Sequence, residues 1–204
     1  MIETITTGSY ATNSYIISND KKECIIVDPG LNYKEASLYI KSKYTPKAVF
    51  LTHCHFDHID GIEYFMDLPI YIHKLDEEGL YDNVLSLYYM MNRCAPFSKG
   101  DLDIRTVEDG DIISIIGYEF KVYHTPGHTN GSCVFFFDNN LLSGDTLFRG
   151  SCGRVDFPSG DASKMEKSLK KIIAKFDDNV KCYPGHEGET TIGFERKNNP
   201  FINN

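Results

Sequence analysis

The stretch His53-Cys54-His55-Phe56-Asp57-His58 follows the apolar run Ala48-Val49-Phe50-Leu51 and holds several side chains that can bind a metal ion. Imidazole and carboxylate groups together suit zinc or iron. His53 and His55 are two residues apart, so on an extended backbone both side chains point to one face. Cys54 then points to the opposite face, and we expect no coordination by its thiol. The stretch therefore predicts a metal site at the end of a strand.

Three further candidate ligands lie downstream in turns that contain glycine. His128 and His186 each follow a Pro-Gly pair, and Asp145 follows a glycine. The predicted metal ligands are His53, His55, Asp57, His58, His128, Asp145 and His186. Seven ligands are too many for one tetrahedral ion and suit two, with Asp145 placed to bridge them. Two ions that share a water lower its pKa towards ~7, and the resulting hydroxide attacks a carbonyl carbon. Asp57 is also the candidate catalytic residue.

The composition is that of an ordinary globular protein. The chain has 204 residues, of which 41% are hydrophobic and 25% charged, so we treat residues 1–204 as a single domain. It contains no apolar run of the ~18 residues that cross a bilayer and begins without a secretory signal, so we expect a cytoplasmic protein with no membrane partner. The net charge of -8 argues against a nucleic-acid partner. The oligomeric state stays open.

Alternating apolar and turn segments predict an α/β fold. Strands are expected at 13–18, 24–27, 48–52, 70–72, 111–116, 118–123, 133–137, 141–143 and 180–183. Helices are expected at 33–44 and from Asp161, which can cap its helix, to about Phe176. Strands followed by a helix and a strand occur in both halves. Two sheets between helices would bring the strand-end loops to one edge, as a site built from separate loops requires.

Residues from about 74 to 100 differ in character from the rest. Leu80, Leu87 and Met91 suggest helical segments, and the aromatic and methionine side chains among them are numerous. This predicts a helical insertion, which either packs on the core or forms a flap that shapes the substrate pocket.

Several polar residues outside the ligand set have two interpretations. Asp28 can cap a turn or orient a ligand histidine. His73 is expected to be structural, and His124 is expected either to be structural or to support a ligand from outside the ligand set. Lys99, Arg149 and Arg154 are either solvated charges or partners of a substrate carboxylate. The six cysteines form no Cys-x-x-Cys pair, and we expect them to be reduced.

The motif at 53–58, with His128, Asp145 and His186 downstream, resembles that of the metallo-β-lactamase-fold hydrolases. Gly144-Asp145-Thr146-Leu147-Phe148, Cys152-Gly153-Arg154 and the tail from Thr190 to Phe201 are similar to the short, single-domain glyoxalase II (hydroxyacylglutathione hydrolase)-like subgroup. The resemblance implies an αββα sandwich of two mixed β-sheets flanked by helices.

The resemblance also implies a binuclear site and a reaction. One ion takes His53, His55 and His128; the other takes Asp57, His58 and His186, and Asp145 bridges them. The implied cofactors are two divalent ions, Zn²⁺ or else iron or manganese. The implied substrate is a small-molecule thioester of the S-lactoylglutathione type or a related ester, cleaved by a metal-bridging hydroxide.

Other functions in the same fold remain open. One is a persulfide dioxygenase with a single iron ion, and another is a lactonase, β-lactamase or other small-ester hydrolase. A metal-binding scaffold without catalysis is a further alternative. Glyoxalase II continues into a helical domain that contacts glutathione, whereas eighteen residues follow His186 in this sequence. The contacts to glutathione are therefore not carried over.

Overall fold

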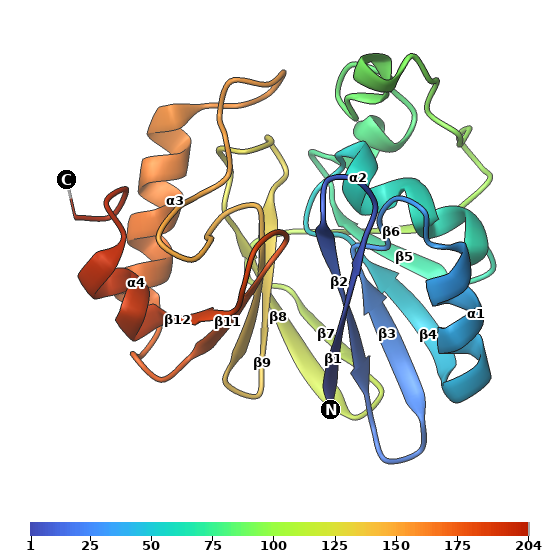
Figure 1. Ribbon diagram of the computed structural model, residues 1–204, viewed down its shortest axis with the longest axis horizontal. Helices are drawn as coiled ribbons and strands as arrows, with labels where there is room; N and C mark the ends of the chain where they lie inside the picture. The colour runs from blue at the N-terminus through green and yellow to red at the C-terminus, as the bar shows by residue number, and fades with distance from the viewer. Residues whose placement is uncertain (204) are drawn as a thin grey trace.

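The computed structural model describes residues 1–203, within which twelve strands form two six-stranded sheets (Figure 1). The strand order is β1-β2-β3-β4-β5-β6 in the first sheet and β12-β11-β10-β9-β8-β7 in the second. Helix α1 covers the outer face of the first sheet, and α3 and α4 cover that of the second. Both sheets mix parallel and antiparallel pairs. The predicted αββα sandwich is confirmed.

The elements follow one another in two similar halves. The first half contains β1 (Ile2–Thr7), β2 (Thr12–Ser18), β3 (Glu23–Val27), α1 (Lys34–Lys43), β4 (Thr45–Phe50), α2 (Phe56–Ile59), η1 (Asp60–Tyr64), β5 (Pro69–His73), η2 (Glu77–Leu80), η3 (Tyr88–Met91) and β6 (Asp103–Val107). The second contains β7 (Ile112–Ile115), β8 (Tyr118–His124), β9 (Cys133–Phe137), β10 (Asn140–Gly144), α3 (Ala162–Lys175), β11 (Lys181–Pro184), β12 (Thr190–Thr191) and α4 (Ile192–Asn198).

Three apolar clusters hold the layers together. The cluster between the sheets centres on Phe50, whose ring lies 5.1 Å from that of Phe120 and 5.0 Å from that of Phe135. The other two clusters join each sheet to its outer helices. Strand β3 serves two clusters, because Ile25 faces the other sheet and Ile26 faces α1. A strand buried on both faces needs the continuous apolar run seen in its sequence.

The site loops follow strands that run in the same direction. Strands β3, β4 and β5 are parallel to one another, and β10 is parallel to β11. Their carboxyl ends therefore lie at one edge of each sheet. The Cys133 backbone N–H donates to the Thr52 carbonyl at 2.9 Å, so the edges of the two sheets are joined beside the ligand loops. The loops after β4 and β8 meet at the upper edge in Figure 1.

Some sequence-based boundaries were wrong. Strand β4 ends at Phe50 rather than at Thr52, because the Thr52 N–H donates to the Asp28 carboxylate instead of to a neighbouring strand. Strand β1, strand β6 and helix α4 were not predicted. Strand β1 is an edge strand in which only Ile2 and Ile5 are apolar, three positions apart, so it lacks a regular apolar pattern.

The segment between β5 and β6 carries two 3₁₀ turns, η2 and η3, in place of the helical segments expected there. Leu87 and Asn92 flank η3 with φ of 65° and 51°, and residues with positive φ interrupt a right-handed helix. The Asp82 side chain accepts from the Val84 and Leu85 N–H groups, each at 2.8 Å, and fixes a local turn. Local hydrogen bonding thus overrides the helical spacing of the apolar residues.

The tail that was singled out in the sequence has a structural role. The Glu195 carboxylate is fully buried and accepts hydrogen bonds from the Gly150 N–H, the Thr190 hydroxyl and the Asn199 amide. The Asn199 amide also donates to the Ser151 carbonyl at 2.9 Å. Helix α4 is therefore fastened to the loop that follows Asp145. Among residues 1–203, no helix is long and apolar enough to cross a membrane.

His73 and His124 lie outside the predicted site and stack on each other, with ring centroids 4.0 Å apart. Burial, and then His124 and Lys74, lower the pKa of His73 to about 4, against the opposing effect of Glu108 and Asp109. An unfolded histidine titrates near 6.5. The unfolded state therefore takes up a proton first as the pH falls, so stability is lost between about pH 6.5 and pH 4.

We expect His73→Gln to make unfolding less sensitive to acid. The wild-type free energy of unfolding should fall by about 1–3 kcal/mol more than that of the variant between pH 7 and pH 4.5. Urea unfolding of both proteins at both pH values measures this difference and cancels the contribution of the other histidines. An equal loss in both proteins would refute the assignment of this pH dependence to His73.

Candidate metal centre

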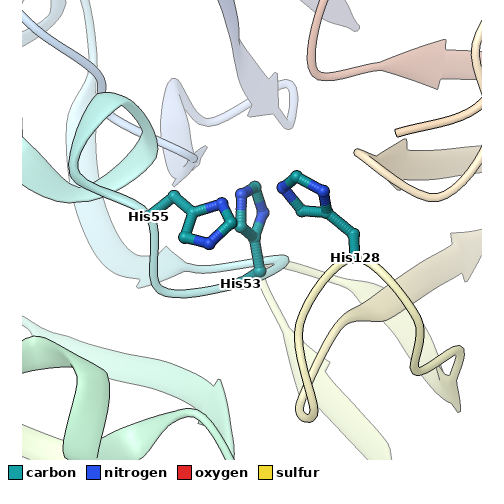
Figure 2. Close-up of side chains that lie close together, drawn as sticks. All are labelled: His53, His55 and His128. Atoms are coloured by element: carbon teal, nitrogen blue, oxygen red, sulfur yellow. The ribbon is translucent and has the colours of Figure 1, made fainter. Parts of the chain in front are cut away.

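Three histidines from two loops meet at the shared edge (Figure 2). His53 and His55 come from the loop after β4, and His128 comes from the loop after β8. Their ring centroids lie 4.5–4.8 Å apart, and one nitrogen of each lies within 4.8 Å of those of the other two. The three rings therefore form one candidate metal site. Cys54 points away, because its Sγ lies 3.6 Å from the Leu85 carbonyl oxygen.

A second group lies beside the first and is made of Asp57, His58 and His186. The Asp57 Oδ2 atom is 3.4 Å from His186 Nε2 and 3.7 Å from His58 Nε2. Asp145 stands between the two groups. Its carboxylate oxygens are 3.4 Å from Nε2 of His58 and of His128, and 3.5 Å from that of His186. The structure thus brings all seven predicted ligands together.

Asp28 also lies near His53 and His58, but its oxygens are already occupied. Oδ1 accepts from the Thr52 N–H at 2.8 Å, and Oδ2 accepts from the Thr52 hydroxyl at 2.7 Å and from His58 Nδ1 at 3.1 Å. A carboxylate that holds the far nitrogen of a ligand histidine fixes the orientation of that ring. The sequence left open whether Asp28 caps a turn or orients a ligand histidine. The structure supports the second interpretation, with His58 as the oriented histidine.

Backbone carbonyls hold two other histidines in the same way. Nδ1 of His128 lies 2.7 Å from the Arg154 carbonyl, and Nδ1 of His186 lies 3.0 Å from the Tyr10 carbonyl. Each Nδ1 must carry the proton in order to donate to an acceptor oxygen, so the Nε2 atom has a free lone pair. In His58, His128 and His186 the nitrogen that faces the centre is therefore the one that can bind a metal.

The donor set fits bound metal ions. Within residues 1–203, the buried atoms without a hydrogen-bond partner include Nε2 of His53, His55 and His128, and Oδ1 of Asp145. Buried polar atoms normally have partners, and a cation shared by these atoms would provide one. Burial, together with the neighbouring histidines, also lowers the pKa of His53 and of His55 well below the usual value. Both imidazoles are therefore neutral, as metal ligands must be.

The second group favours positive charge. Burial lowers the pKa of His58, but Asp145, Asp57 and Asp28 outweigh it and raise this pKa to about 10. Burial raises the pKa of Asp57, but the neighbouring His58 and His186 have the larger opposite effect. The pKa of Asp57 is therefore held below its usual range. Three carboxylates around one buried histidine create a negative electrostatic potential. A divalent cation would offset this potential more fully than a single proton on the histidine.

A cavity of about 380 Å³ opens onto the centre. Five of the seven ligand residues line it: His55, Asp57, His128, Asp145 and His186. Of the three cations considered from sequence, Arg154 lines this cavity, whereas Lys99 pairs with Glu78 and Arg149 lies over the Phe194 ring. Leu87 and Met90 also line it, so part of the segment at 74–100 borders the centre.

Two residues that support the centre had no signal in the sequence. The Thr12 hydroxyl donates to Asp57 Oδ2 at 3.1 Å, although the two residues are 45 positions apart. The buried Asp76 carboxylate accepts from the Cys54 N–H, the Thr129 hydroxyl and the Gly131 N–H. Asp76 lies in the acidic run Asp76-Glu77-Glu78, which has the pattern of a solvated surface.

The two Pro-Gly-His turns use glycine for different reasons. Gly127 has φ of 146°, a conformation that glycine favours. Gly185 is not among the residues with positive φ, so the two turns differ although both contain Pro-Gly-His. A Cβ atom there would collide with Asp145 Oδ1 and lie 2.6 Å from His58 Cε1. Close packing against two ligands therefore excludes a side chain at Gly185.

We expect Gly185→Ala to displace Asp145 and His58. Overpacking of this kind costs about 1–3 kcal/mol, which corresponds to a loss of roughly 5- to 150-fold in metal affinity. Titration of the purified variant with Zn²⁺ against a competing chelator measures this loss. Gly188→Ala is the matched control, because a Cβ atom at Gly188 meets nothing within 4 Å. Equal affinities in the two variants would contradict the packing argument.

Comparisons with known proteins agree with this geometry. The chain is 35% identical over 172 residues to a hydroxyacylglutathione hydrolase of Citrobacter koseri, a match that covers 82% of this chain and 59% of that protein. It is similar to the crystal structure of the BLEG-1 B3 metallo-beta-lactamase, with TM-score 0.91, 33% identity and full coverage of both chains. TTHA1623 in a di-iron-bound form gives TM-score 0.81 and 32% identity, over 98% of this chain and 99% of that one.

A family model points the same way and covers most of the chain. The model for the metallo-beta-lactamase superfamily matches residues 7–186, a range that begins in β1 and ends at the last predicted ligand. This chain is a member of the metallo-beta-lactamase superfamily.

Proposed function

We propose that this protein is a metal-dependent hydrolase that cleaves thioesters, the class to which S-lactoylglutathione belongs. The observation that carries the proposal is the set of buried, unpartnered imidazole and carboxylate atoms at the floor of a cavity. His53, His55 and His128 would hold one ion, Asp57, His58 and His186 a second, and Asp145 would bridge them. Two divalent ions, when bound, lower the pKa of a shared water and polarise an acyl carbonyl.

The residues of the chain orient the reacting groups. The Asp57 carboxylate faces the cavity and is held by the Thr12 hydroxyl at 3.1 Å. The pKa of Asp57 is held below its usual range, so its carboxylate is ionised and can accept a hydrogen bond that orients the attacking water. Asp28 and the Tyr10 and Arg154 carbonyls keep three histidine rings in place during the reaction.

The side chains beside the centre support hydrolysis without a covalent intermediate. Cys152 lines the cavity, and burial raises the pKa of its thiol to about 11. A thiol that stays protonated near neutral pH is a poor nucleophile. The similarity to a hydroxyacylglutathione hydrolase supports a thioester as the substrate class. The match covers 59% of that relative, so the similarity supports the thioester class and does not extend to the thiol that carries the acyl group.

The first experiment measures metal content and activity on one sample purified without added metal. We expect two equivalents of zinc, iron or both, with hydrolysis of S-lactoylglutathione or a simpler thioester. His55→Ala should abolish turnover, and His124→Ala is the control because His124 stacks on His73 outside the centre. A single iron, no thioester hydrolysis and oxygen uptake with glutathione persulfide would overturn the proposal in favour of a persulfide dioxygenase.

A second candidate is the hydrolysis of β-lactams, which the similarity to the BLEG-1 metallo-beta-lactamase favours. The same centre would polarise the lactam carbonyl. A chromogenic cephalosporin assayed on the same sample tests this candidate. A higher kcat/KM for the cephalosporin than for every thioester tried would replace the thioesterase proposal.

A further inference from the structure

The cavity beside the candidate metal centre has an apolar wall. Beyond the ligand residues, its wall contains the large side chains of Tyr10, Phe56, Leu87, Met90, Phe148 and Phe157. They come from the turn before β2, from α2, from the segment at 74–100 and from the loops after β10. A pocket of about 380 Å³ with mainly apolar walls is of the size and kind that binds small organic ligands.

The aromatic rings reach directly to the ligands. The Phe157 ring packs edge-on against His55, and the Phe148 ring against His186, each with centroids 5.8 Å apart. Tyr10, another residue of the wall, packs edge-on against Phe56 with centroids 5.2 Å apart. A substrate group next to the reacting carbonyl therefore meets hydrocarbon in this wall.

Leu87 is held in a strained conformation at this wall. Its φ is 65°, whereas its side chain is 2% exposed and lines the cavity. A left-handed conformation costs a non-glycine residue about 1–2 kcal/mol. Such strain persists where the surroundings impose it, and it is concentrated at functional sites. The Ser86 carbonyl accepts from the Phe56 N–H at 2.8 Å and ties this strained turn to the helix that carries Asp57 and His58.

The charged groups of the wall offer no free cation. Among residues 1–203, Arg154 and Glu187 are the charged residues that line the cavity besides the ligands. Nε and Nη2 of Arg154 each lie 2.7 Å from a different oxygen of Asp156, and the guanidinium lies 3.9 Å from the Phe157 ring centroid. This two-bond pair occupies one edge of the guanidinium, and both side chains are exposed to solvent. A carboxylate on the substrate would have to compete with Asp156 and would be repelled by Glu187.

We propose that the part of the substrate that fills this cavity is an uncharged aliphatic or aromatic group. The inference rests on the proposed thioesterase function and narrows it to thioesters whose acyl group and leaving thiol carry no carboxylate near the reacting carbonyl. The thiol released by the preferred substrate is small and neutral.

Two thioesters that differ in one charge test this inference on the metal-loaded protein. S-butyryl 3-mercaptopropionamide and S-butyryl 3-mercaptopropionate have the same shape, and only the second is an anion. We expect kcat/KM to be at least roughly tenfold higher for the amide. A preference for the anion that disappears in Arg154→Gln would overturn the inference, because Arg154 would then be a carboxylate anchor.

Substitution of Met90 offers a second test, in which the substrate preference is changed without disturbing the core. Its side chain is 49% exposed at the rim, so substitution should leave the fold intact. Met90→Lys places a free cation at the wall, and we expect it to raise kcat/KM for the anion and lower it for the amide. Met90→Gln, which adds polarity without charge, is the matched control. An unchanged ratio of the two substrates in Met90→Lys would count against the cavity as their binding site.

Binding measurements with analogues that cannot be hydrolysed test the apolar pocket and the proposed reaction separately. The ketone analogues of the two thioesters, with CH₂ in place of sulfur, cannot be hydrolysed, and calorimetry gives their dissociation constants. Tighter binding of the neutral ketone without turnover of any thioester would overturn the reaction and support the apolar pocket. Turnover of thioesters with tighter binding of the anionic ketone would support the reaction and overturn the inference.

Discussion

Replacing Asp145 by asparagine is expected to lower kcat/KM for thioester hydrolysis by more than about 100-fold, beyond the 10–100-fold typical of an outer partner of a metal. Asp145 lies within 3.4–3.5 Å of one histidine of the first group and two of the second. One of its oxygens is buried without a hydrogen-bond partner. An amide keeps the shape but removes the charge that would offset two cations. Both metal positions should therefore weaken together.

Metal analysis and steady-state kinetics on the Asp145→Asn variant measure these effects. Circular dichroism should show a wild-type fold, because the replacement has the same shape. Asp20→Asn is the control, since Asp20 is exposed in the turn before β3. Two tightly bound metal equivalents in the Asp145 variant would show that Asp145 does not link the two positions.

Asp76→Asn is expected to weaken the three-histidine group selectively. The Asp76 side chain is 3% exposed and accepts from the Gly131 N–H and the Thr129 hydroxyl, each at 2.6 Å, and from the Cys54 N–H at 3.2 Å. Cys54 lies between His53 and His55, and Thr129 follows His128. One carboxylate thus joins the two loops that supply this group. An amide turns one acceptor into a donor and leaves at least one buried N–H or O–H group without a partner.

The stability of the metal-free protein should fall by about 1–3 kcal/mol, the cost of one unsatisfied buried group. Metal affinity at the three-histidine position should fall by about 10–100-fold, and that at the other position by less. Urea unfolding and chelator competition with Co²⁺, followed by its absorption spectrum, measure both quantities. Glu78→Gln, two residues away on the surface, is the control. Equal weakening of both positions would mean that Asp76 supports the fold in general and not this pair of loops.

Much of the fold and of the candidate centre could be predicted from local sequence. The apolar runs at β3 and β9 indicate strands that are buried on both faces, and the structure buries them between two layers. Asp161 was predicted to cap a helix, and its side chain accepts from the Lys164 N–H. The histidines and carboxylates after the strands are close together because parallel strands end at one edge.

The conformation of the segment at 74–100 was beyond this kind of reasoning. Its apolar spacing is helical, but the side chain of Asp82 and the positive φ of Leu87 and Asn92 impose short turns. Propensity favours a helix there only weakly, and local hydrogen bonds together with tertiary packing decide the outcome.

Residue type and spacing are enough to predict the chemistry of the candidate centre, because they specify which donors follow which strand. The groups that support and surround that centre become visible only once the layers are packed together. Asp76 is a buried link between loops, Gly185 is a point of close packing, and Arg154 is paired with Asp156 beside an apolar wall. Apart from the Arg154–Asp156 pair, these contacts join residues far apart in the chain. Periodicity and motif report only on neighbours in sequence, whereas burial and close approach depend on how the layers pack.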